Sequence, residues 1–312
     1  MVINKAKCAV QSLNVGLNFG CDVKRDRVMG VILAPRGFEV PLANANTYED
    51  VLEYLQNAAL STTNRVLPLT RPLFGATDNT ADPTAITSGY GNIYGYTDDP
   101  KSFQLEIDNY GYTWWKRLSA ANMGNWSVYV IDKTFIEGQL TSTGFAGFDA
   151  NIFVQKPQYD GTNGVRHYMN VTLNNPLAMG AVGDILQFPY DGYDISKELN
   201  GLTDLHLTAT PGAGSVSVVV ETLAGRTNVY DQYKSELSDP DAWKVYNVAT
   251  GAVVPVTAVA ANDATKSFSL SVTAGQRSVS LASPAELVAL GVGSQTMGGY
   301  ESNVVQVTVT GA

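Results

Sequence analysis

Runs in which apolar and polar residues alternate recur through the C-terminal part of the chain, and they constrain its fold more than any other feature. Two clear examples are Ser267–Val272 and Val304–Thr310. Successive side chains of a β-strand point to opposite faces, so a period of two is typical of a strand with one buried face. We therefore expect this region to form a sheet with one covered side.

Turn residues separate further runs of the same kind in this region. The predicted strands are Leu205–Thr210, Ser215–Thr222, Trp243–Val248, Val253–Val259, Ser267–Val272, Val279–Ala282 and Val304–Thr310. Short strands at such close intervals are typical of a β-sandwich. One helix is expected at Ser283–Leu290, where Ser283 is the N-cap, Pro284 the first residue and Glu286 the third.

A domain boundary is expected in segment 182–200, because Pro189 and Gly192 interrupt it. After this segment, alternating strand-like runs appear at short intervals with turn residues between them. We therefore expect two domains, residues 1–200 and 201–312.

The first of these domains combines strand patterns with two helical ones. Thr47 is a good N-cap for a helix that ends near Leu60, and a second short helix is expected from Tyr112 to Ala121. The predicted strands are Arg27–Leu33, Arg65–Leu69, Phe103–Asp108, Ser127–Asp132, Phe135–Leu140, Ala150–Gln155 and Val165–Leu173. The expected fold class is mainly β: an N-terminal β-sandwich or barrel-forming domain with one or two short helices, followed by a C-terminal β-sandwich.

Composition and charge exclude several classes of protein. Hydrophobic residues make up 45% of the 312 residues, which argues against intrinsic disorder. The net charge of −9 comes without the clustered Lys and Arg of a phosphate-backbone binder. The N-terminus has no apolar stretch of signal-peptide length and no apolar run suits a membrane span, so we expect a protein made in the cytoplasm. Cys8 and Cys21 are either two reduced thiols or a single bridge.

Residues that carry enzyme chemistry are sparse. His167 shares a face of an alternating run with Val165 and Met169, which predicts a packed histidine, and His206 is expected to face solvent. The sequence has no Gly-x-Ser-x-Gly elbow and no zinc-ligand spacing. The nearest approach to a calcium loop is Asp78–Asp82. We expect no enzyme activity, no cofactor and no metal.

The cluster Trp114-Trp115-Lys116-Arg117 supports two interpretations. The indole rings could make an aromatic contact with a sugar or a base, with the cations as support. Alternatively, an amphipathic helix buries both rings and leaves Lys116 and Arg117 exposed. The tyrosines at 90, 94, 96, 110 and 112 suit a protein-contact surface, because Tyr provides a large contact area at low entropic cost.

The C-terminal domain resembles bacterial and phage immunoglobulin-like domains. The segment Gly298–Val309 is similar to their last strand, although the Cys–Trp–Cys core of antibody domains is absent. The resemblance implies an immunoglobulin-like β-sandwich.

The first domain resembles the major tail proteins, or tail tube subunits, of long-tailed bacteriophages over about residues 69–173. The stretches that carry the resemblance are the turn Thr77-Asp78-Asn79-Thr80, the segment Ile86–Gly91, the strand Phe103–Asp108, the pair Trp126–Asp132 and Phe135–Gly138 with its tight link Lys133-Thr134, and Gly144–Phe148. Some subunits of this family carry a C-terminal immunoglobulin-like domain outside the tube, which matches the order of the two domains.

This resemblance implies a virion structural protein, assembled in the host cytoplasm, whose copies form a ring, as in a hexamer, and contact other virion proteins. Candidate inter-subunit loop residues are Thr77, Asp78, Asn79, Thr80, Ser88, Gly89, Tyr90 and Gly91, and candidate lumen-facing acids are Glu106, Asp108 and Glu137. DNA would pass through without specific binding, because attraction to phosphate would arrest it. The outer domain would be displayed on the surface and contact a glycan weakly.

Other functions stay open at this point. A neck, collar or capsid decoration protein of a virion could share the same composition and domains. A carbohydrate-binding adhesion module would use Trp114, Tyr94 and Tyr96. A carboxylate-based glycosidase would be the enzyme alternative.

Overall fold

The computed structural model describes residues 27–70, 75–107, 112–122, 124–160, 164–180, 182–190 and 192–311. Strands account for 46% of the structure and helices for 16%, so the chain is mainly β, as expected. Its residues form two compact units. The first contains the described residues up to Leu55 together with Asn64–Glu198, and the second contains Gln56–Thr63 and the described residues from Leu199 onward. The sequence placed Gln56–Thr63 in the first domain.

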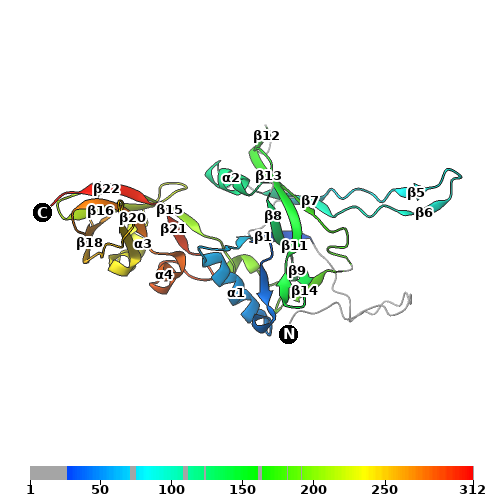
Figure 1. The fold of residues 1–312 in the computed structure, drawn as a ribbon, viewed down its shortest axis with the longest axis horizontal. Coiled ribbons are helices and arrows are strands. Elements are labelled where there is room, and N and C mark those ends of the chain that lie inside the picture. The colour runs from blue at the N-terminus through cyan, green and yellow to red at the C-terminus, as the bar shows by residue number, and fades with distance from the viewer. Residues whose placement is uncertain are drawn as a thin grey trace. The chain divides into compact units, whose positions relative to one another are not determined.

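The main sheet of the first unit is antiparallel throughout and runs in the order β3-β1-β8-β11-β13-β7-β4. Figure 1 labels its central strands β1, β8, β11, β13 and β7. Its strands are β3 (Leu67–Leu69), β1 (Val28–Pro35), β8 (Asn125–Asp132), β11 (Phe148–Val154), β13 (Gly164–Leu173), β7 (Ser102–Ile107) and β4 (Gly75–Asp78). The short strand β12 (Gln158–Asp160) pairs with the first residues of β13. Strands β3 and β4 therefore lie at the two ends of this path.

A second group of strands continues from β8. It contains β9 (Phe135–Leu140), β10 (Gly144–Ala146), β2 (Glu39–Pro41) and β14 (Asp184–Gln187), with β9 between β10 and β14. The pairs Val130–Glu137 and Ile131–Ile136 join β9 to β8 through the tight link that the sequence predicted. Short 3-10 helices lie at Leu42–Asn44 (η1) and Ile195–Lys197 (η3).

Alternation along β7 and β13 decides which side of the sheet is buried. Phe103, Leu105 and Ile107 of β7 point into the hydrophobic core, and so do Met169 and Val171 of β13. The intervening polar residues of both strands point to the other face. His167 shares the buried face, so its packed position is confirmed.

The described residues before 200 form two α-helices, and both were predicted. Helix α1 (Tyr48–Leu60) begins with a capping box, in which the Thr47 Oγ1 accepts from the Asp50 amide at 3.1 Å and the Asp50 carboxylate accepts from the Thr47 amide at 3.0 Å. Helix α2 (Tyr112–Leu118) continues into a 3-10 turn, η2 (Ser119–Ala121). No helix within the described residues is long and apolar enough to cross a membrane.

The second unit is a sandwich of two sheets. One sheet has the order β18-β19-β16-β15-β21 and the other β17-β20-β22. The strands are β15 (Thr203–Pro211), β16 (Ser215–Thr222), β17 (Trp243–Asn247), β18 (Ala258–Asn262), β19 (Ser267–Ser271), β20 (Gly275–Leu281), β21 (Tyr300–Ser302) and β22 (Val305–Val309). The helices are α3 (Tyr230–Tyr233), η4 (Glu236–Ser238), η5 (Pro240–Ala242) and α4 (Pro284–Ala289).

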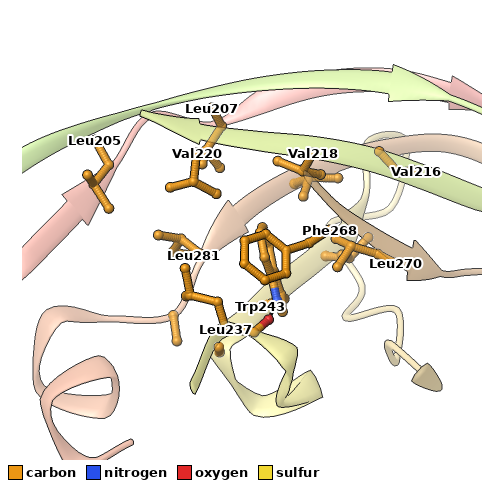
Figure 2. Packing of buried hydrophobic residues seen from close by; sticks show 14 of the residues in the cluster. Leu205, Leu207, Val216, Val218, Val220, Leu237, Trp243, Phe268, Leu270 and Leu281 are labelled. Carbon is orange, nitrogen blue, oxygen red and sulfur yellow. Dashed lines mark hydrogen bonds between the residues drawn. The ribbon is translucent and has the colours of Figure 1, made fainter. Parts of the chain in front are cut away.

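Residues from both sheets form the core of this sandwich, as Figure 2 shows. The rings of Trp243 and Phe268 lie near its centre, with their centroids 5.7 Å apart. The indole Nε1 of Trp243 donates a hydrogen bond of 2.8 Å to the carbonyl of Leu237, so the buried polar atom is satisfied. Each large side chain buried here contributes roughly 1.5–3 kcal/mol of hydrophobic stabilisation.

The sequence prediction was accurate for α4 and inaccurate for one strand. The capping box of Ser283 and Glu286, with Pro284 in the first turn, is present as predicted. The strand expected at Val253–Val259 is instead β18, which begins at Ala258. Val253 and Val254 still pair with β17, and Pro255, which has no N–H to donate, follows where the chain leaves that sheet.

Candidate functional site

The main candidate site is a long hairpin arm that leaves the sheet between β4 and β7. We define the arm as residues 79–100; it contains β5 (Ala85–Thr87) and β6 (Ile93–Tyr96), and Figure 1 shows it extending away from the sheet of the first unit. It includes most of the loop that the sequence singled out. A hairpin that does not pack on its own sheet leaves both of its faces accessible.

Polar side chains fasten the base of the arm. The Lys101 ammonium forms an ion pair with the Asp78 carboxylate, and Asp78 also accepts from the Thr80 amide at 3.0 Å and from the Thr80 hydroxyl at 2.6 Å. The Thr80 hydroxyl in turn accepts from the Ser102 amide at 3.1 Å, and the Asn79 amide donates to the Ser102 carbonyl at 2.8 Å. These contacts fix the angle at which the arm leaves the sheet.

We call these contacts at the base of the arm the clamp, and they stabilise the charged form of the Asp78 carboxylate. Its hydrogen bonds, first from Lys101 and then from Thr80, lower its pKa to about 2. The side chain that the sequence offered as the start of a calcium loop is therefore paired with a lysine.

Backbone hydrogen bonds organise the rest of the arm without help from the body of the unit. The Thr97 amide donates to the Thr84 carbonyl at 2.8 Å, and the strands β5 and β6 pair beyond it with a register shift near Thr87. At the tip the Ser88 hydroxyl accepts from the amides of Tyr90 and Asn92, both at 3.2 Å. Gly91 has φ +80°, which a glycine adopts without strain. Gly89 lies inside this turn.

The arm exposes large apolar and aromatic side chains to solvent. Tyr90 at the tip is 95% exposed and Tyr94 is 77% exposed. The other exposed members are Ile86, Ile93 and Tyr96. Sequence reasoning selected the tyrosines but not the two isoleucines, although isoleucines in a Gly- and Thr-rich hairpin are a usable signal. Exposed aromatic and branched apolar residues concentrated on one element are typical of a binding surface.

A second candidate surface is the polar face of the sheet formed by β4, β7, β13 and β11. Cross-strand pairs cover it: the Gln104 amide donates to Asn170 at 3.0 Å, and the Ser102 and Thr172 hydroxyls lie 3.1 Å apart. Thr77 of β4 lies opposite Gln104 in the register and is exposed. Cross-strand polar pairs of this kind stabilise the sheet and leave this face accessible to water.

The charges on this polar face are arranged as ion pairs. Glu106 pairs with Arg166, and the Tyr168 hydroxyl donates to the same carboxylate at 3.5 Å. Arg36 and Asp149 form a looser pair at 3.9 Å. Sequence reasoning found Glu106 and missed Arg166, although Arg166 occupies an outward position in the alternation of its strand. These described charges of the face are therefore paired with opposite charges.

The other two candidate lumen acids do not join Glu106. Glu137 in β9 is 2% exposed, so it does not lie on an accessible wall of this chain and we withdraw it as a wall residue. The backbone at Gly183 lies against it: a Cβ built there would be 2.8 Å from the Glu137 Oε1. Asp108 lies outside the described residues, and so do Cys8 and Cys21.

Of the two tryptophans in α2, the structure describes the side chain of Trp115. The Trp115 indole donates to the Gln155 carbonyl at 2.6 Å and is half-buried against the core, while Lys116 and Arg117 beside it are exposed. This agrees with the amphipathic interpretation for Trp115. Trp114 lies in the same helix, but its side chain is not among those that the structure describes.

The two histidines that were weighed for catalysis belong to different units. Burial lowers the pKa of His167, which lies inside the core of the sheet, and His206 is half-buried in β15 of the second unit. Among the described residues, no group of three or more His, Cys, Asp or Glu side chains could hold a metal ion.

The fold and these surfaces define a mainly β protein of two units with a preformed arm and a polar sheet face. Comparison with models of known protein families and with curated proteins found no match.

Proposed function

We propose that the chain is a structural subunit of a bacteriophage virion, which assembles with copies of itself into the rings of a tail tube that conducts DNA. The observation that carries this proposal is the arm. Its backbone is organised by its own hydrogen bonds, its base is clamped by Asp78 and Lys101, and its aromatic side chains are exposed. A preorganised aromatic element binds a partner without the cost of ordering a loop.

The polar sheet face supports the conducting role. In this proposal the face with Glu106 and Arg166 lines the channel. Its ion pairs cancel, so the described residues of the face offer no cluster of free cations to hold the phosphates of DNA. The net charge of −9 acts in the same direction.

The two ends of the sheet path support assembly with other copies. Strands β3 and β4 each have a single strand partner among the described residues. Edge strands are sites where a sheet can continue into another chain, and a closed ring removes such edges. The immunoglobulin-like second unit would be displayed on the outside of the ring.

The test is electron microscopy and sedimentation of the purified full chain. Stacked rings or tubes are the expected result, and monomers alone at high concentration would contradict the proposal. The variant with Tyr94→Ala and Tyr96→Ala should need about a thirtyfold higher protein concentration to assemble. This factor corresponds to about 2 kcal/mol, the cost of removing an aromatic anchor from an interface. A matched control is Tyr246→Ala in the second unit, which should leave assembly unchanged.

The same experiment separates the alternatives. Single rings without tubes would favour a neck, collar or capsid decoration protein. Binding to a glycan array that the change at Tyr94 and Tyr96 abolishes, with no assembly, would favour a carbohydrate-binding adhesion module.

A further inference from the structure

One corner of the first unit collects positive charge in an otherwise acidic chain. We define the basic corner as Lys116, Arg117, Lys156 and Tyr159. Each of the three cationic side chains is exposed, and the Tyr159 side chain is 86% exposed. Lys116 and Lys156 form no ion pair with any residue that the structure describes.

Tertiary contacts bring these residues together from three segments. The Trp115 indole donates to the Gln155 carbonyl at 2.6 Å, and Lys116 and Lys156 are the next residues on the two sides of this contact. The Asn122 side chain donates to the Val154 carbonyl at 3.0 Å and fixes the end of η2 to the same strand.

Tyr159 faces the same side of the sheet as α2. It lies opposite Val165 in the register of β12 and β13, and paired residues in antiparallel strands point to the same face. Val165 alternates with His167 and Met169, which point into the core that Leu118 of α2 also joins. The basic corner is therefore one surface with a tyrosine beside its cations.

The arm has the complementary chemistry. Residues 79–100 contain Asp82, Asp98 and Asp99 and no Lys, Arg or His, and all three carboxylates are exposed. Exposed tyrosines lie beside these acids, as Tyr159 lies beside the cations of the corner. Opposite charges with aromatic side chains on both sides are typical of an interface in which charge sets the docking register.

The arm and the corner of one chain are too far apart to satisfy each other. Strand β12 pairs with residues 164–166 at the start of β13, whereas Ser102 at the base of the arm pairs with Thr172 near its end. From this base the arm extends further away from the sheet (Figure 1). A contact between two different surfaces of two copies is heterologous, and such contacts generate closed rings or extending filaments.

We propose that the arm of one copy docks on the basic corner of the next copy. This inference rests on the proposed function and names the receptor surface for the arm. The acids of the arm pair with Lys116 and Lys156 of the receiving copy, and the tyrosines on both sides exclude water from these pairs.

A charge-swap experiment on the full chain tests the proposal. The corner variant Lys116→Glu with Lys156→Glu, and the arm variant Asp98→Lys with Asp99→Lys, should each raise the concentration needed for assembly at least about tenfold, because like charges then face each other. A chain with all four changes should regain assembly, since the signs are opposite again. Lys133→Glu with Lys197→Glu changes the net charge as the corner variant does and should assemble normally. Circular dichroism and urea unfolding would verify that each variant is folded.

The outcomes separate the two proposals. Assembly of the wild type together with normal assembly of the corner variant would overturn this inference and leave the proposed function standing. A combined variant that fails to assemble although it is folded would overturn it as well. Wild-type protein that stays monomeric would contradict both. DNA binding by the wild type that the corner variant loses, without any change in assembly, would assign the corner to nucleic acid and overturn the docking proposal.

Discussion

The Asp78 carboxylate and the Lys101 ammonium form an ion pair across the two chain segments that enter and leave the arm. The Thr80 side chain bridges the same carboxylate to the backbone of Ser102. An Asp that the sequence places in a turn therefore fixes the position of the arm, which forms only in the folded chain.

This clamp predicts acid sensitivity of the arm. The pKa of Asp78 is lowered from 3.8 to about 2, so the contribution of its charged form is present above pH 3.8 and is lost as the pH falls through 2. At neutral pH we expect Asp78→Asn to be cleaved within residues 79–100 faster than the wild type. Near pH 2 we expect an acid-tolerant protease to cleave the wild type there faster than it does above pH 3.8. Asp82→Asn, an exposed acid in the same arm, is the control. Equal cleavage rates for the two variants at neutral pH would show that the ion pair does not hold the arm.

The two ion pairs on the polar sheet face should differ in their effect on stability. The side chains of Glu106 and Arg166 are 21% and 20% exposed, whereas those of Arg36 and Asp149 are 65% and 51% exposed. Arg166→Gln should lower the free energy of unfolding by about 1–3 kcal/mol, because it removes the ion-pair partner of a partly buried carboxylate. Arg36→Gln should cost less than about 0.5 kcal/mol. Urea unfolding of both variants measures the difference, and equal losses would contradict this ranking.

A cluster of aromatic rings in the first unit predicts alkaline sensitivity. The rings of Tyr48 and Tyr193 lie 5.5 Å apart at 82°, and burial raises the pKa of Tyr193 to about 12 and that of Tyr48 further. The stabilisation from the neutral Tyr193 phenol is complete below pH 10 and is lost as the pH rises through 12. Tyr193→Phe should move the alkaline unfolding transition to higher pH, as monitored by circular dichroism. Tyr190→Phe, a change at the exposed member of the cluster, should not move it.

The capping box of α4 predicts a local loss of stability. The hydrogen bonds of Glu286, first with Ser283 and then with Lys244, lower its pKa to about 2. Ser283→Ala should reduce the free energy of unfolding of the second unit by about 1 kcal/mol and raise the pKa of Glu286 toward its ordinary value. Thermal unfolding and a carboxyl-carbon NMR titration measure the two effects. An unchanged titration of Glu286 would show that Ser283 does not contact it in solution.

The sequence was most informative where neighbours in the chain decide the structure. The N-caps Thr47 and Ser283 predicted the starts of α1 and α4, because a capping box joins residues three positions apart. Alternation likewise predicted which residues of β7 and β13 are buried, since a strand turns successive side chains to opposite faces. These features rest on a few consecutive residues and do not require a partner strand to be known.

The candidate site was predictable only in part. Thr77–Thr80 and Ser88–Gly91 were selected from the sequence as an inter-subunit loop, and Glu106 as a lumen-facing acid; Glu106 lies on the polar face of β7, and its place in a lumen stays a prediction. The burial of Glu137 was not predictable, because alternation cannot show that a distant segment around Gly183 covers the other face of β9. The basic corner had no sequence signature beyond Lys116 and Arg117, since Lys156 joins it through the Trp115–Gln155 hydrogen bond.

The sequence by itself determined the mainly β composition, the starts of α1 and α4, and the buried faces of β7 and β13. The tertiary structure alone decided that Val253 and Val254 stay with β17 before the chain crosses at Pro255, and that Gln56–Thr63 belong to the second unit. The physical reason is range: backbone dihedrals and side-chain direction follow from adjacent residues. Burial, strand partners and the meeting of charged side chains depend on segments that are far apart in the chain.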